Sequence, residues 1–310
     1  MKFKVGTRGS KLARMQTEKF LEELKQMRPE AEFELKIIKT LGDTEKNKPL
    51  FAIDSQGIFQ KEIDQALVEG EVDFAVASLK DVPTQQIAET IVAAVPKRGS
   101  RQDVLISKDN VLLKDLKKGA LVGTASLRRL AAIKNVRPDL KVQPIRGNVD
   151  TRISKVKKGE VDAIVVAEAG LDRMELADQI TELLPLDVFP SAPGQGALAI
   201  VTRRDDVGTI KFLTAEEHTM TRAEVTAERS LMLALGGGCR VPIGSIGLAE
   251  GNSLLLRGVL FTVDGQSKIE ATERNTVDKA DELGKKVAEN LAKQGAKEIE
   301  ENWREKYGPW

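Results

Sequence analysis

The sequence Gly-Glu-Val-Asp-Phe-Ala-Val-Ala at residues 70–77 ends a helical pattern and begins a buried strand. The apolar positions Phe59, Ile63 and Leu67 have helical spacing, and Val72–Ala77 is apolar enough to be covered on both faces. The first four residues, Gly-Glu-Val-Asp, return at 159–162 between another predicted helix and strand. This recurrence predicts two α/β units of similar design, each with a mostly parallel sheet between helices.

A second recurrence supports the same organisation. Val-Gly-Thr occurs at 5–7 and at 122–124, each time leaving a strand and entering a helix that begins near a serine. The elements predicted around the first copy are a strand at Lys2–Thr7, a helix at Ser10–Met27 with Ser10 as its N-cap, and a strand at Glu32–Lys39. Further along, Gly57–Val68 is predicted to be helical.

The C-terminal part of the chain has a different order of elements. A long helical pattern is followed by three strand-like stretches and a closing amphipathic helix, an order typical of a small α+β domain. These elements are predicted at Thr219–Leu235, Ile243–Ala249, Ser253–Val263, Gln266–Thr272 and Val277–Gln294.

Composition narrows the class of protein. The chain has 310 residues, enough for two or three domains, and a formal charge of +1, which excludes a broadly basic nucleic-acid-binding protein. It has one cysteine, Cys239, and one histidine, His218, so neither an internal disulfide nor a Cys/His metal site is expected. No signal segment or membrane-length apolar run is present, and we expect a cytoplasmic protein without membrane or nucleic-acid partners.

Arginines gather where predicted strands end and helices begin. The stretches are Thr-Arg-Gly-Ser at 7–10, Gly-Thr-Ala-Ser-Leu-Arg-Arg at 123–129 and Ile-Arg-Gly-Asn-Val-Asp-Thr-Arg at 145–152. Free backbone N–H groups and the helix dipole favour an anion there, and the guanidinium fork matches a carboxylate or phosphate. Surface arginines that only maintain solubility are the alternative, but three clusters at the carboxyl edge of the sheets favour a polyanionic ligand.

Two further loops are candidates for the cleft between the units. In Val-Ala-Ser-Leu-Lys-Asp-Val-Pro-Thr at 76–84, Asp81 is either an ordinary turn aspartate or a carboxylate that stabilises a developing cation. Ser-Ala-Pro-Gly-Gln-Gly-Ala-Leu at 191–198 is predicted to turn into a strand, and could be a hinge or a close approach of the backbone to a ligand.

The single thiol lies in an unusual setting. In Leu-Gly-Gly-Gly-Cys-Arg-Val-Pro-Ile-Gly, at 235–244, the glycines end the preceding helix, so Cys239 is expected on a loop. A lone cysteine is most often an inert buried residue. Here Arg240 follows it, and a neighbouring cation favours the nucleophilic thiolate, which indicates an attachment point.

These stretches resemble the hydroxymethylbilane synthase, or porphobilinogen deaminase, family. The resemblance runs in order from residue 3 to about residue 300 and rests on six motifs. They are Ser-Leu-Lys-Asp-Val-Pro at 78–83, Gly-Thr-Ala-Ser-Leu-Arg-Arg at 123–129, Arg-Gly-Asn-Val-Asp-Thr-Arg at 146–152, Ala-Gly-Leu-Asp-Arg at 169–173, Pro-Gly-Gln-Gly-Ala at 193–197 and Gly-Gly-Cys-Arg-Val-Pro-Ile-Gly at 237–244.

The resemblance implies a fold of two α/β domains similar to type II periplasmic binding proteins, plus a small α+β C-terminal domain. The expected domains are 1–96 with 197–214, 102–190, and 219–310. It also implies an enzyme, typically monomeric, that joins four porphobilinogen molecules head to tail with loss of ammonia. In such an enzyme the growing chain of pyrrole rings is attached to a dipyrromethane cofactor, which the enzyme assembles from its own substrate. Water then releases linear hydroxymethylbilane.

The resemblance also assigns roles by position. Asp81 is the catalytic carboxylate, stabilising the azafulvene cation formed when ammonia leaves, and Cys239 carries the cofactor through a thioether. The positions matched to cofactor contacts are Ser78, Lys80, Thr124, Ser126, Arg128, Arg129 and Arg152. Those matched to substrate contacts are Arg8, Ser10, Phe59, Arg146, Gly147, Arg173 and Gln195.

The chain departs from the family at three positions. The family's Gly-Gly-Lys-Gly-Leu-Phe loop is here Asp-Ser-Gln-Gly-Ile-Phe at 54–59, so Gln56 replaces a lysine, and Ala52 replaces a second basic residue. Ala77 stands where a histidine usually precedes the Ser-Leu-Lys-Asp motif. These changes concern contacts of the loop with carboxylates and leave Asp81 and Cys239 in place.

Two other functions remain as alternatives. A non-catalytic anion-binding protein with the same cleft explains the arginines, but leaves Cys239 and the third domain unexplained. An unrelated cysteine-nucleophile transferase is the second alternative, and no histidine partner for the thiol is visible in the sequence.

Overall fold

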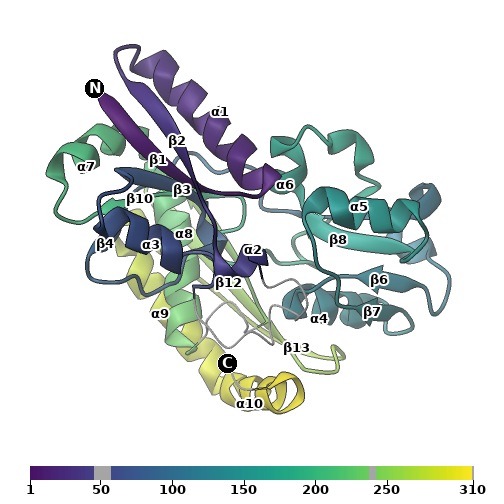
Figure 1. Cartoon of the computed structure of the whole chain (residues 1–310). Helices are drawn as coiled ribbons and strands as arrows, with labels where there is room; N and C mark the ends of the chain where they lie inside the picture. The colour runs from purple at the N-terminus through teal and green to yellow at the C-terminus, as the bar shows by residue number, and fades with distance from the viewer. Residues whose placement is uncertain (45–56, 237–241, 309–310) are drawn as a thin grey trace.

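The computed structural model describes residues 1–44, 57–236 and 242–308, which form three sheets with their covering helices. Figure 1 shows the N-terminal unit mainly in purple and blue, the second unit in teal beside it, and the C-terminal region in green to yellow, ending in α10 at the bottom of the view. The strand orders are β2-β1-β3-β10-β4, β7-β6-β8-β5-β9 and β11-β12-β13.

The first unit is built from two separate stretches of the chain. Its elements are β1 (Lys2–Arg8), α1 (Lys11–Met27), β2 (Glu32–Ile38), α2 (Leu41–Thr44), α3 (Lys61–Val68), β3 (Phe74–Ser78), β4 (Thr90–Ala94), β10 (Leu198–Arg203) and α7 (Val207–Leu213). The Ser10 hydroxyl accepts a hydrogen bond from the Ala13 N–H and caps α1 as expected.

The second unit is continuous in sequence. Its elements are β5 (Asp103–Ser107), β6 (Leu121–Gly123), α4 (Leu127–Val136), β7 (Lys141–Gln143), α5 (Val149–Lys157), β8 (Ala163–Ala167), α6 (Glu168–Arg173) and β9 (Glu182–Leu184). Ser126 caps α4, as the recurrence of Val-Gly-Thr indicated.

The two five-stranded sheets share one topology. In each sheet, one strand, β10 or β5, is inserted antiparallel between two of the other four, which all run the same way. Alternate side chains of β3 and of β8 enter different hydrophobic clusters, so both faces of each sheet are covered. The predicted α/β fold with two similar, mostly parallel units is confirmed.

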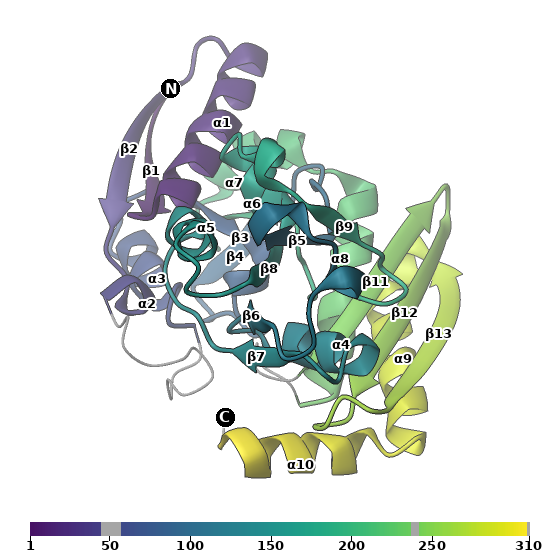
Figure 2. The same cartoon turned by 90° about the vertical axis from the view of Figure 1, so that its right-hand side faces the viewer.

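The C-terminal region is a three-stranded antiparallel sheet packed against helices, also as predicted (Figure 2). Its elements are α8 (Thr219–Ala234), β11 (Ile243–Glu250), β12 (Ser253–Phe261), β13 (Lys268–Thr276), α9 (Ala280–Lys293) and α10 (Ala296–Tyr307). The sequence prediction missed α10. Most residues of α10 are charged, so the sequence showed little sign of a packed helix. Its Trp303 is nevertheless fully buried and donates its indole N–H to the Phe261 carbonyl at 2.8 Å.

Two helix starts differ from the prediction. Residues 57–60 form a turn and α3 begins at Lys61, because Gly57 takes a left-handed conformation with φ of 71°. The closing helix begins at Ala280, because Val277–Lys279 form a 3-10 turn that connects it to β13. No helix among the described residues is long and apolar enough to cross a membrane.

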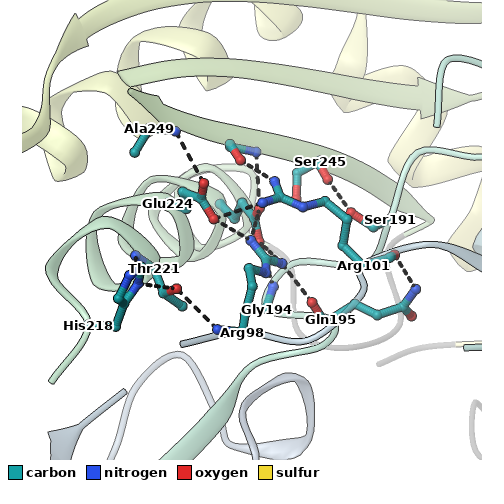
Figure 3. Close-up of polar contacts among 12 residues, drawn as sticks. Arg98, Arg101, Ser191, Gly194, Gln195, His218, Thr221, Glu224, Ser245 and Ala249 are labelled. Atoms are coloured by element: carbon teal, nitrogen blue, oxygen red, sulfur yellow. Dashed lines mark hydrogen bonds and ion pairs between the residues drawn. The ribbon is translucent and has the colours of Figure 1, made fainter. Parts of the chain in front are cut away.

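The α8 helix holds both connections between the α/β units. Arg98 and Arg101, in the connection from β4 to β5, donate to the Glu224 carboxylate at 3.2 and 2.9 Å (Figure 3). Glu228 is fully buried and accepts hydrogen bonds from Arg98 and from the N–H of Gly194, which lies in the connection from β9 back to β10. Paired buried charges of this kind fix the helix against both crossing segments.

Candidate active site

Asp81 lies at the carboxyl edge of the first sheet. It ends the 3-10 turn η2 (Leu79–Asp81) that follows β3, and its side chain is 32% exposed. Its Oδ2 atom is 3.6 Å from Nη1 of Arg8, which ends β1. Asp43 binds the same guanidinium more closely, at 2.6 and 3.3 Å. The Arg8 side chain is therefore held mainly by Asp43, and Asp81 is only loosely paired.

The Phe59 ring covers the Arg8 guanidinium. The centre of the Phe59 ring lies 3.7 Å from the Arg8 Cζ atom, a cation–π contact. Only a glycine at position 42 allows this packing, because a Cβ atom there would lie 2.0 Å from the ring. Two residues assigned to substrate contacts, Arg8 and Phe59, are thus brought together beside Asp81.

In the second unit, Arg128 and Arg129 both bind a buried carboxylate, Asp103. Arg128 donates to it at 2.7 Å, and Arg129 donates through two nitrogens at 2.7 and 3.0 Å. Burial alone would raise the pKa of Asp103, but the two guanidiniums outweigh it and hold the pKa well below its usual range. The Gln195 amide also donates to Asp103 at 2.9 Å, so it serves this cluster from within the protein.

Lys80 lies where the two units meet. Burial has the largest influence on its ammonium group and lowers the pKa, and the charge of Arg129 lowers it further. Asp81 and Asp103 oppose this, and the resulting pKa is about 8 instead of 10.5. A lysine of the first unit therefore interacts with charged groups of the second, so the charged residues of the two units lie close together here.

Arg152 and Arg146 extend the positive charge along the second unit. Burial lowers the pKa of Arg152 to about 10, and repulsion by Arg129 and Arg146 contributes. The Arg152 Nε donates to the Gly147 carbonyl at 2.9 Å. Gly147 has φ of 112°, and a Cβ atom there would lie 2.8 Å from Thr151, so only glycine fits this bend.

The hydroxyls assigned to the site lie at helix starts. Ser10 caps α1, and Ser126 caps α4 by accepting from the Arg129 N–H at 3.4 Å. The Thr124 hydroxyl accepts from the Ser126 N–H at 3.2 Å. These contacts satisfy free N–H groups at the starts of α1 and α4, and a helix N-terminus favours negative charge.

Ser78 and Arg173 join the two units through Gln16. The Ser78 hydroxyl donates to the Gln16 Oε1 atom at 3.2 Å, and Arg173 donates to the same oxygen at 3.4 Å. Arg173 also donates to the Gly196 carbonyl at 2.6 Å. Both assigned residues therefore lie at the junction of the units, with protein partners already in contact.

Three positions discussed from the sequence, Ala52, Gln56 and Cys239, lie outside the described residues. The third departure from the family, Ala77, is described. It is 6% exposed and packs in a hydrophobic cluster with residues of α3, β10 and α8. At this position the chain therefore places an apolar methyl group in the core.

Comparison with known proteins identifies the family. Residues 3–211 match the family model "Porphobilinogen deaminase, dipyromethane cofactor binding domain", and residues 222–293 match "Porphobilinogen deaminase, C-terminal domain". The chain belongs to the porphobilinogen deaminase family. A probable porphobilinogen deaminase of Nitrosopumilus maritimus is 44% identical over all of this chain and 99% of its own length. The porphobilinogen deaminase of Thermus thermophilus is 45% identical over 95% of this chain and 97% of its own.

Among solved structures, the chain is similar to the VFT2 domain of BvgS from Bordetella pertussis. The two share 17% identity over 74% of this chain and 92% of that chain, with a TM-score of 0.43.

Membership of the porphobilinogen deaminase family confirms two sequence predictions. The chain is an enzyme, a transferase, and its cofactor is dipyrromethane. The alternative of a non-catalytic anion-binding protein is not supported. The assignments of individual site residues stay predictions.

The cationic side chains of this region fit this cofactor. Each pyrrole of a dipyrromethane bears an acetate and a propionate, so the group is a polyanion. Burial is the main cause of the lowered pKa values of Lys80 and Arg152, and the charge of Arg129 lowers both further, so Arg129 repels both of these cations. Carboxylates placed among these groups would relieve that repulsion and accept charge-assisted hydrogen bonds.

Removing the Asp103 charge is expected to destabilise the protein. In Asp103→Asn, Arg128 and Arg129 remain as adjacent buried cations without their counterion, at a cost of about 3 kcal/mol in the free energy of unfolding. Denaturant unfolding of the variant measures the loss. Asp139→Asn, which removes the surface partner of Arg137, is the control and should have little effect. Equal losses of stability in the two variants would contradict a stabilising role for the ion pairs of Asp103 with Arg128 and Arg129.

Lys80→Met is expected to stabilise the protein prepared without its cofactor at pH 7. At pH 7 Lys80 is protonated in both the folded and the unfolded protein, and its lowered pKa of about 8 means that this charge destabilises the folded state. Between pH 8 and pH 10.5 only the unfolded chain keeps the proton, so this destabilisation diminishes as the pH rises. Thermal midpoints of variant and wild type at pH 7 and pH 10 test this, with the exposed Lys297→Met as control. A difference that does not shrink at pH 10 would contradict the prediction.

Proposed function

We propose that this chain condenses four porphobilinogen molecules head to tail, with loss of ammonia, and releases linear hydroxymethylbilane. The observation that carries the proposal is the position of Asp81 beside two cationic side chains, Arg8 and Lys80. Asp43, Asp81 and Asp103 each pair with an arginine of this region. Asp103 is clamped by two arginines and Asp43 binds Arg8 at 2.6 Å, whereas the Asp81 ion pair is longer, at 3.6 Å. Asp81 is therefore the carboxylate best placed to meet a substrate cation.

Asp81 has to counter the charge of its own surroundings. Loss of ammonia leaves a positive charge on the substrate ring, and Arg8 and Lys80 would repel it. A fixed carboxylate beside the ring stabilises that charge as it develops, because a preorganised charge needs no reorganisation in the transition state. The same carboxylate can accept a hydrogen bond from the pyrrole N–H.

The cationic residues bind the acetate and propionate groups of the rings. We propose that Ser78, Lys80, Thr124, Ser126, Arg128, Arg129 and Arg152 serve the cofactor. We propose that Arg8, Ser10, Phe59, Arg146, Gly147, Arg173 and Gln195 serve the substrate. Several act through the backbone or through other residues: Gln195 supports Asp103, and Gly147 allows the bend that holds Arg152.

Cys239 is the proposed attachment point of the cofactor, through a thioether. When bound, the dipyrromethane supplies the acceptor ring for the first substrate molecule. The proposal rests on the sequence, because Cys239 is the only cysteine in the chain and matches the family motif at 237–244.

The proposed working form is a cytoplasmic monomer without nucleic-acid or membrane partners. Its proposed domains are 1–96 with 197–214, 102–190, and 219–310. This division agrees with the three separate sheets and with the inserted position of β10 in the first of them.

Mass spectrometry and an ammonia assay test the function together. The intact protein should carry the mass of two linked pyrrole units, and porphobilinogen should add a ladder of further units while ammonia is released. A protein of unmodified mass that releases no ammonia from porphobilinogen would contradict the proposal.

A further inference from the structure

One arginine of the C-terminal region reaches the turn that carries Asp81. Arg229, on α8, donates to the carbonyls of Leu79 and Val82 from Nη1, at 3.2 and 2.9 Å. It donates to the Pro83 carbonyl from Nη2, at 2.6 Å. The three carbonyls lie on both sides of Lys80 and Asp81 in the chain, so one guanidinium spans the whole turn.

The turn has few hydrogen bonds of its own. Its described backbone bonds are Leu79 N–H to the Ala197 carbonyl at 3.0 Å and Val82 N–H to the Leu79 carbonyl at 3.1 Å. A single 3-10 turn leaves carbonyls at its end without partners, and buried carbonyls need donors. The planar guanidinium of Arg229 supplies those donors in a fixed arrangement, which the flexible ammonium group of a lysine can reproduce only in part.

Arg229 is itself held in place. The preceding residue, Glu228, is fully buried and accepts hydrogen bonds from Arg98, from the Gly194 N–H and from the Gly247 N–H. One turn earlier, Glu224 binds Arg98 and Arg101 (Figure 3). The α8 helix is thus fixed against both connections between the units, and Arg229 transmits that fixed position to the turn.

We propose that Arg229 is a positioning residue that sets the location of the Asp81 carboxylate relative to Arg8 and Lys80. This inference rests on the proposed role of Asp81. If so, the α8 helix of the C-terminal region influences the reaction rate, although it lies outside the two α/β units. A displacement of about 1 Å in a reacting group can reduce a rate about 100-fold, so three bonds that fix one turn can matter as much as a direct contact.

The test compares Arg229 with an arginine of matching geometry. Arg137 also donates to three carbonyls around a 3-10 turn, those of Leu113, Lys114 and Leu116, at 2.7, 2.8 and 2.7 Å. That turn belongs to the second unit and bears no assigned site residue. Arg137→Met therefore controls for the loss of a carbonyl clamp as such.

The measurements are made on cofactor-bearing protein and expressed per cofactor, by intact mass. In Arg229→Met, kcat for ammonia release should fall about 10- to 100-fold with KM nearly unchanged. Arg229→Lys should recover part of the rate, since an ammonium can reach some of the carbonyls. Arg137→Met should lose thermal stability but keep the wild-type kcat.

Three outcomes overturn the inference while wild type is active: a wild-type kcat in Arg229→Met, a fall in kcat of Arg137→Met equal to that of Arg229→Met, or a change confined to KM. If Arg229→Met does not fold, the Arg229→Lys variant decides, because a wild-type kcat there would also overturn it. Failure of the proposed function is distinguishable, since wild type itself would then release no ammonia.

Discussion

Asp81→Ala is expected to fold normally and to lose release of ammonia from porphobilinogen by a factor of about 1000. The substrate cation would then develop among Arg8 and Lys80 with no carboxylate beside it. Stability should change little, because the Asp81 side chain is 32% exposed and its ion pair with Arg8 is 3.6 Å long. Thermal unfolding and a single-turnover ammonia assay measure the two effects separately.

Asp43→Asn is the matched control for Asp81. It removes the carboxylate that binds the same arginine more tightly, at 2.6 Å. If loss of Asp81 acted only by releasing Arg8, then Asp43→Asn should slow the reaction at least as much. Near-normal turnover in Asp81→Asn would show that the charge of the carboxylate is not needed.

Cys239→Ser is expected to lose both the covalent mass increment and all measurable synthesis. A serine hydroxyl is a far poorer nucleophile than a thiolate, so the primer would not become attached. Intact mass and product formation, compared with wild type, test this directly.

The single thiol makes an independent check possible. Because Cys239 is the only cysteine, a wild-type chain that carries the cofactor should show no free thiol under denaturing conditions. One reactive thiol per fully active chain would place the attachment elsewhere. A fully active Cys239→Ser protein without an adduct would show that synthesis needs no covalent attachment at all.

Local patterns in the sequence predicted much of the fold. The Ser10 cap, the apolar run that became β3 and the repeated Gly-Glu-Val-Asp each depend on neighbours within a few residues, so their structural meaning can be recognised without coordinates. The α10 helix was missed because its anchor, Trp303, packs against β12, which lies far back in the chain.

The candidate site was predicted only in part, for the same reason. Its motifs located Asp81 and the arginines, but not the carboxylates that hold them. Asp103 is 25 positions from Arg128, and the carbonyls bound by Arg229 lie about 150 positions before it. No periodicity connects residues at such separations. The arginine clusters were a usable signal, since several buried guanidiniums require at least one buried carboxylate among them.

The inserted strand β10 has a consequence for how the chain folds during synthesis. The first sheet is complete only when Leu198–Arg203 has left the ribosome, because β10 lies between β3 and β4. The second sheet needs only the stretch from β5 to β9 and can close earlier. The N-terminal half, although made first, must therefore wait with an open sheet edge that is prone to association. We therefore expect the second sheet to form before the first, which reverses their order of synthesis.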